Sequence, residues 1–185
     1  LAGESGRTVL QVSGLSTVYP TDRGDVQAVR GVDLTLREGD VLAIVGESGC
    51  GKSATLLSMM QLVPHPGRVV AGSVVFEGRD LTKLGPGAMR EVRGRDIAMV
   101  FQDPMTTLNP AFRVGDQIAE SLRVHGFLPG FPARLAHASR AREREMVIDL
   151  MRKVGIPSPE TRHLEYPHQF SGGMQQRILI AIALA

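Results

Sequence analysis

The sequence has a single cysteine and no long hydrophobic run, and each scarcity excludes a class of protein. Cys50 has no second cysteine with which to form an internal disulfide, which fits a reducing compartment. The longest apolar run, Ile178–Ala185, has eight residues, whereas a membrane-spanning helix needs roughly 18–20. The first residues lack the basic start and apolar stretch of a signal peptide. We therefore expect a cytosolic chain.

Charge is also nearly balanced. The 21 basic and 19 acidic residues leave a formal net charge of +2, which is too small to suggest nucleic-acid binding. The arginine-rich run at 140–146 indicates a solvated helix face, because Glu143 and Glu145 interleave with its arginines. With 185 residues, 43% of them hydrophobic, the chain is long enough for one globular domain with a real core.

The order of hydrophobic patterns predicts an α/β chain. Strands rich in β-branched residues are expected at 8–19, 26–37 and 69–78. Two short apolar runs predict strands buried on both faces, Val41–Val45 and Ile97–Phe101. Helices are expected at 54–62, 88–94, 114–124 and 133–154, and from about 173. On the helix at 133–154, one apolar stripe is formed by Met146, Val147, Leu150, Met151 and Val154.

The segment GESGCGKS, Gly46–Ser53, fits the pattern G-x-x-x-x-G-K-[ST] between a predicted buried strand and a predicted helix. Glycines let such a loop curl so that backbone N–H groups point at phosphate oxygens, and the following helix adds its dipole. In this pattern Lys52 reaches the β- and γ-phosphates, and the Ser53 hydroxyl is placed to bind Mg²⁺. The predicted nucleotide-binding residues are Gly46, Glu47, Ser48, Gly49, Cys50, Gly51, Lys52 and Ser53.

A second phosphate-binding feature follows about 120 residues later, in the segment SGGMQQR, Ser171–Arg177. A serine and two glycines that open a helix make another helix N-terminus suited to an anion. One chain rarely needs two such sites for one triphosphate. The simplest explanation is that Ser171, Gly172, Gly173 and Met174 contact a nucleotide held by another subunit.

Together these motifs resemble the Walker A and signature motifs of ABC transporter ATPases, in which two ATP molecules lie between two nucleotide-binding domains. The segments VGESGCGKS, MVFQDPMTTLNP and YPHQFSGGMQQR are most similar to the ATP-binding subunits of dipeptide, oligopeptide and nickel importers. The resemblance extends along essentially the whole chain. It implies a P-loop NTPase (RecA-like) core with an N-terminal antiparallel β-subdomain and a helical subdomain, and it implies ATP and Mg²⁺ as cofactors.

The resemblance also implies roles for residues outside the two loops. Gln102 is expected to contact Mg²⁺ and the attacking water, so that Lys52 and Gln102 are the predicted catalytic residues and Ser53 and Gln102 the metal ligands. Tyr19 is expected to stack on adenine, although an aromatic residue in this place could instead pack within the β-subdomain. The segments expected near the groove that receives a permease's coupling helix are Pro104–Phe112 and Tyr166–Gln169.

By this resemblance residues 1–185 form an incomplete nucleotide-binding domain. The β-subdomain and P-loop core are expected at about 1–101, the Q-loop and helical subdomain at about 102–170, and the signature motif with its helix at 171–185. The family continues with a Walker B strand and a catalytic glutamate, which follow the signature helix. We therefore expect residues 1–185 to lack ATPase activity on their own.

Two functions remain open on the sequence alone. The first is the ATP-binding subunit of an importer of peptides or nickel, at the cytoplasmic face of the inner membrane. Its partners would be a second ATPase subunit, identical or not, two transmembrane permease subunits and, indirectly, a solute-binding protein. The second is a non-transport ABC ATPase that works as a nucleotide-driven switch. The segments FQDPMTTLNP and YPHQFSGGM favour the first.

Overall fold

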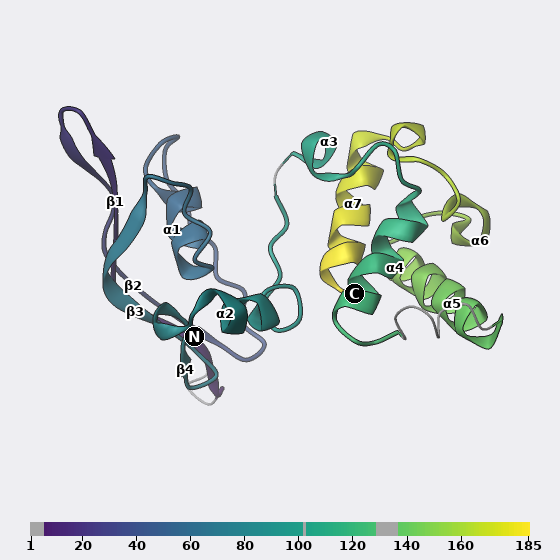
Figure 1. Ribbon diagram of the computed structural model, residues 1–185, viewed down its shortest axis with the longest axis horizontal. Coiled ribbons are helices and arrows are strands. Elements are labelled where there is room, and N and C mark those ends of the chain that lie inside the picture. The colour runs from purple at the N-terminus through teal and green to yellow at the C-terminus, as the bar shows by residue number, and fades with distance from the viewer. Residues whose placement is uncertain (1–5, 102, 129–136) are drawn as a thin grey trace. The chain divides into compact units, whose positions relative to one another are not determined.

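A computed structural model of the protein describes residues 6–101, 103–128 and 137–185 (Figure 1). The chain divides into two compact units, Leu1–Arg90 and Glu91–Ala185. The first unit holds an antiparallel sheet and a helix, and the second is helical. Every helix among the described residues is too short or too polar to cross a membrane.

The first unit is built on a four-stranded antiparallel sheet with the strand order β2-β1-β3-β4. Its strands are β1 (Thr8–Thr21), β2 (Gly24–Arg37), β3 (Arg68–Phe76) and the short β4 (Arg79–Asp80). The register of β1 shifts between Val12 and Leu15 against β2, and between Ser13 and Ser16 against β3. Because a bulge changes the alternation of side chains, Val12, Leu15 and Val18 are all buried, with at most 6% of each exposed.

Helix α1 (Lys52–Met59) packs against the three long strands of this sheet (Figure 1). The Ser58 hydroxyl donates to the Ala54 carbonyl, so the Thr17 hydroxyl of β1 donates to Ser58 Oγ, at 2.7 Å. Beyond the helix, the Gln61 amide donates to a backbone carbonyl of the 3-10 helix that follows β4. These bonds fix the direction of α1. Two short helices follow the sheet, η1 (Leu81–Lys83) and α2 (Pro86–Val92).

Two predicted strands, Val41–Val45 and Ile97–Phe101, are wrong, because the described backbone there is not a strand apart from an isolated bridge at Ile97. Val41 is 97% exposed and Val45 89%, the opposite of the predicted burial. A strand needs partners for its N–H and C=O groups on the neighbouring chain. The single sheet of the described residues does not include these runs, so their apolar side chains remain uncovered.

The long helices of the second unit agree with the sequence-based prediction. They are α4 (Val114–Val124), α5 (His137–Lys153) and α7 (Gly172–Ala183). Three one-turn helices lie in segments for which no helix was predicted: α3 (Pro104–Thr107), α6 (Pro159–Arg162) and the 3-10 helix η3 (Pro167–Gln169). Helices this short contain no repeat of apolar residues, which is why the hydrophobic pattern missed them.

Helices α4, α5 and α7 pack against one another (Figure 1). Their apolar stripes meet in one core of this unit. The stripe predicted on α5 is confirmed, since Val147, Leu150 and Met151 are buried and its other two members are partly buried. Helix α7 buries Ile178 completely in the same core and leaves Ile180 40% exposed on its other side. The core thereby holds α7, which begins with the second predicted phosphate-binding motif.

The first turn of α4 is joined by backbone hydrogen bonds to the segment that precedes that motif. The N–H groups of Val114 and Gly115 donate to the carbonyl oxygens of Glu165 and His163, each at 2.9 Å. A Cβ on Gly115 would lie 2.5 Å from the His163 oxygen, which is backbone and does not swing aside. Position 115 therefore requires glycine for space rather than for conformation.

We expect Gly115→Ala to destabilise the protein by about 1–3 kcal/mol, because the added methyl group pushes the two segments apart. Helix propensity alone predicts the opposite sign, a stabilisation of about 1 kcal/mol. Urea unfolding measures which effect prevails. The control is Gly173→Ala in α7, where an added Cβ meets no described atom within 4 Å. A variant at 115 that is no less stable than the one at 173 would contradict the steric requirement.

Candidate functional site

The loop Gly46–Gly51 leads into α1 and has the curvature of an anion cradle. Gly49 and Gly51 have φ angles of 82° and 98°, in the left-handed region that residues with a Cβ rarely adopt. A Cβ on Gly51 would also collide with the Ala28 carbonyl of β2. The loop therefore curls tightly against the sheet only with glycine at these positions.

Lys52 lies over this loop. Its Nζ donates to the carbonyl oxygens of Gly46 and Glu47, both at 2.7 Å, and lies 3.5 Å from the Sγ of Cys50. The ammonium group is thus held at the loop by neutral acceptors. Phosphate oxygens in the same place would offer it stronger, charge-assisted hydrogen bonds.

The N-terminus of α1 forms the other part of the cradle. Its N-cap is Gly51, and among the described residues no side chain caps it, so the first N–H groups and the helix dipole favour an anion. Ser53 is exposed in the first turn. The described residues contain no group of three or more His, Cys, Asp or Glu side chains that could hold a metal ion. A cation at the Ser53 hydroxyl would therefore take further oxygen ligands from a phosphate, which is how Mg²⁺ commonly binds.

The second motif begins α7, in the other unit. Ser171 is its N-cap, and its side chain makes no capping hydrogen bond within the described chain. Ser171, Gly172 and Gly173 are all exposed. A Cβ on either glycine would meet no described atom within 4 Å. Packing inside the described chain thus does not explain the two glycines, whereas a close approach by another molecule does.

Two glutamine side chains hold the loop that precedes α7. The buried Gln175 amide donates to the carbonyl oxygens of Pro167 and Phe170, at 2.7 and 3.2 Å. Gln169 accepts a hydrogen bond from the backbone N–H of Tyr166 at 2.7 Å. This loop therefore presents the start of α7 in one conformation.

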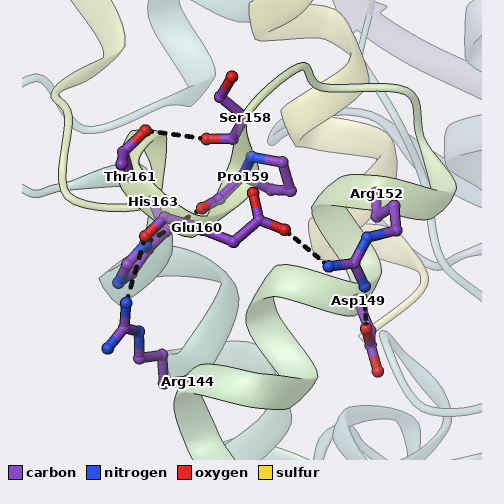
Figure 2. Close-up of polar contacts among 8 residues, drawn as sticks. All are labelled: Arg144, Asp149, Arg152, Ser158, Pro159, Glu160, Thr161 and His163. Carbon is purple, nitrogen blue, oxygen red and sulfur yellow. Dashed lines mark hydrogen bonds and ion pairs between the residues drawn. The ribbon is translucent and has the colours of Figure 1, made fainter.

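Charged side chains fasten α6 to α5 upstream of that loop (Figure 2). Arg152 pairs with Asp149 at 2.5 Å and with Glu160 at 2.8 Å, and Arg144 donates to the Glu160 carbonyl at 3.3 Å. Hydrogen bonds from its own backbone N–H and from Arg152 hold the pKa of the Glu160 carboxyl below its usual value. The pairs are exposed and contribute little to stability, but they orient α6.

The loop after α3 is also held by a glutamine side chain. Gln117 of α4 accepts from the N–H of Asn109 at 3.0 Å and donates to the carbonyl oxygens of Asn109 and Phe112, at 3.0 and 3.1 Å. This arrangement leaves the Phe112 ring 55% exposed. The ring lines a groove of about 950 Å³ between residues of α4 and α7.

Two predicted site residues are not placed at either motif. Gln102 lies outside the described residues. Tyr19 is partly buried in β1, and its ring packs on Gly67, where an added Cβ would lie 2.5 Å from Tyr19 Cε1. Stacking of this ring on adenine stays a prediction.

The sequence pattern did not indicate one residue that contacts the second motif, Arg162. The guanidinium group of Arg162, at the end of α6, contacts both Phe170 and Met174. Its partners are eight and twelve residues away along an irregular segment, so no periodic spacing in the sequence could have indicated them.

Residues 29–185 match the ABC transporter family. The chain is 48% identical over 177 residues to the dipeptide transport ATP-binding protein DppD of Bacillus subtilis, a match that covers 95% of this chain and 50% of the relative. It is 46% identical over 178 residues to the oligopeptide transport ATP-binding protein OppD of the same organism, covering 96% and 47%. The chain therefore spans about half the length of these curated relatives.

Solved structures show the same fold. A dimeric bacterial ABC transporter cassette matches with a TM-score of 0.77 at 24% identity, over 95% of this chain and 69% of that one. A dimeric post-hydrolysis cassette bound to ADP and Pi matches with a TM-score of 0.76 at 23% identity and the same coverage. The antiparallel β-subdomain and the helices are thus those of an ABC cassette. Because the family match takes in both the phosphate loop and the motif at α7, the chain belongs to the ABC transporter family.

Proposed function

We propose that this chain is part of the ATP-binding subunit of a peptide importer, which couples ATP binding and hydrolysis to uptake through a membrane permease. The observation that carries the proposal is the pair of phosphate-binding helix starts, Gly46–Ser53 at α1 and Ser171–Met174 at α7. The names of the relatives, dipeptide and oligopeptide transport proteins, support a peptide rather than nickel as the solute. They also favour transport over a nucleotide-driven switch.

In this proposal the loop and Lys52 hold the β- and γ-phosphates of ATP. The Nζ of Lys52 would leave the carbonyl oxygens of Gly46 and Glu47 and donate to phosphate oxygens instead. Its positive charge would then stabilise the negative charge that develops during phosphoryl transfer. Ser53 and Gln102 are the ligands proposed for Mg²⁺, which would neutralise part of that charge. Gln102 would also orient the attacking water.

The start of α7 is proposed to act on a nucleotide held by a second ATPase subunit. Ser171, Gly172, Gly173 and Met174 would meet its γ-phosphate with the uncapped N-terminus of the helix. The exposure of the first three residues supports this role. The dimeric state of the solved cassettes supports an arrangement of two subunits.

The apolar runs at Val41–Val45 and Ile97–Phe101 are proposed to become strands of a RecA-like core in the complete protein. About a third of the solved cassette's chain, and about half of the relative's, lies outside the matched part and could supply the neighbouring strands. The groove beside Phe112 is the proposed contact with the permease, at the cytoplasmic face of the inner membrane. A solute-binding protein would act indirectly through that permease.

We expect Lys52→Ala to lower ATP hydrolysis at least about 100-fold in the complete protein assembled with its permease, because the transferring phosphate loses a charged donor. Phosphate release measures the rate. Lys153→Ala, which removes an exposed lysine at the end of α5, is the control and should retain the wild-type rate. Wild-type turnover by Lys52→Ala would overturn the assignment of the phosphate loop.

Gly172→Asp should leave folding and the subunit's own ATP binding intact, since an added Cβ meets no described atom within 4 Å. It should stop turnover of the assembled complex, because a carboxylate would face the γ-phosphate of the second subunit's nucleotide. Binding of a fluorescent ATP analogue and phosphate release report the two effects. Gly172→Asn, nearly equal in size but neutral, separates charge from bulk. Normal turnover of assembled Gly172→Asp would rule out the role in trans.

Alkylation of Cys50 with N-ethylmaleimide should block nucleotide binding, and MgATP should slow the reaction. The thiol is exposed within the loop, so an adduct would intrude on the phosphates whatever the reactivity of the sulfur. Cys50→Ser is the control, which should bind nucleotide and resist the reagent. Equal rates of labelling with and without MgATP would show that the thiol points away from the nucleotide.

A further inference from the structure

We propose that Arg162 is a positioning residue for the signature motif. Its guanidinium group joins the loop before α7 to the first turn of α7, and thereby sets the orientation of the exposed residues Ser171–Gly173. The inference rests on the proposed function, since it concerns how this helix start meets the nucleotide of a second subunit.

The guanidinium group has a partner on each of its nitrogens. Nε donates to Glu165 Oε2 at 2.9 Å, Nη2 donates to the Gln169 carbonyl at 3.3 Å, and Nη1 lies 3.3 Å from Met174 Sδ. The plane also lies over the ring of Phe170, with Cζ 4.3 Å from its centre. Contacts in three directions and one stacking contact leave the group a single orientation.

These partners lie on both sides of the motif. Gln169 and Phe170 come immediately before Ser171, and Met174 comes immediately after Gly173. The two glycines have no side chains with which to fix their own position. Arg162 therefore contacts the chain on both sides of Ser171–Gly173, where the two glycines contribute no side-chain contacts of their own.

Arg162 is itself attached to the helical core. Only 19% of its side chain is exposed, so solvent and salt weaken its contacts less than those of a surface pair. It ends α6, which the Arg152–Glu160 pair fastens to α5 (Figure 2). The carbonyl of its partner Glu165 accepts the backbone N–H of Val114 in α4. Helices α5 and α4 thus both help to determine where the guanidinium group of Arg162 lies.

The fold of the loop does not depend on Arg162 alone. Gln175 already donates to the Pro167 and Phe170 carbonyls, and the Phe170 side chain is buried in the core. Arg162 adds a polar side-chain contact that joins the segment before the motif to Met174. Its removal should therefore misplace the motif more than it unfolds the unit.

The test is Arg162→Gln in the complete protein assembled with its permease. We expect kcat for ATP hydrolysis to fall about tenfold or more, since small errors in the position of groups around a reacting phosphate cost large factors in rate. The subunit's affinity for a fluorescent ATP analogue should stay within about twofold, because its own phosphate loop is unchanged. Arg162→Lys should not restore kcat, because one ammonium group does not span three separated partners.

Arg7→Gln is the control, an arginine of the first unit with two carboxylate partners, Glu38 and Glu77, and no described contact with the motif. Its kcat should equal that of the wild type. An unchanged kcat in Arg162→Gln, full rescue by lysine, or a parallel loss of kcat, nucleotide affinity and unfolding midpoint would each overturn the positioning role. Lys52→Ala in the same assembly reports separately on the proposed function. If it hydrolyses ATP normally, that function fails; if it is inactive while Arg162→Gln is normal, only the positioning role fails.

Discussion

The two segments proposed to bind phosphate depend on one constraint: a helix N-terminus must keep its N–H groups open to a ligand and still be held in place. At α1 the tight curl of the loop and the Thr17–Ser58 hydrogen bond hold the helix on the sheet. At α7 the helical core, Gln175 and Arg162 hold it from behind. In both cases the fixing contacts leave the first N–H groups of the helix without a side-chain cap among the described residues, so that they stay open to an anion.

The local part of this structure could be predicted from the sequence. The bounds of α4 and the buried stripe on α5 follow from apolar residues a few positions apart. This spacing lies within one segment and can be read without knowing the rest of the fold. Strands depend on neighbours that can lie anywhere in a chain. For that reason Val41–Val45 has the composition of a buried strand and yet lies exposed within the described residues.

The same distinction applies to the site. The residue types of the phosphate loop could be read from their spacing, because the chemistry of phosphate binding prescribes that spacing. The position of Lys52 on the carbonyls of Gly46 and Glu47, and the packing of Tyr19 on Gly67, could not be read in this way. These contacts depend on how separate segments approach each other, which no short pattern encodes.

Two backbone hydrogen bonds join α4 to the segment before α7. Such a junction is indifferent to the side chains on either segment. Side chains on either segment can therefore change without loss of these two hydrogen bonds, so the connection between α4 and the segment before α7 persists. This connection therefore tolerates sequence change on both segments, provided that position 115 stays glycine.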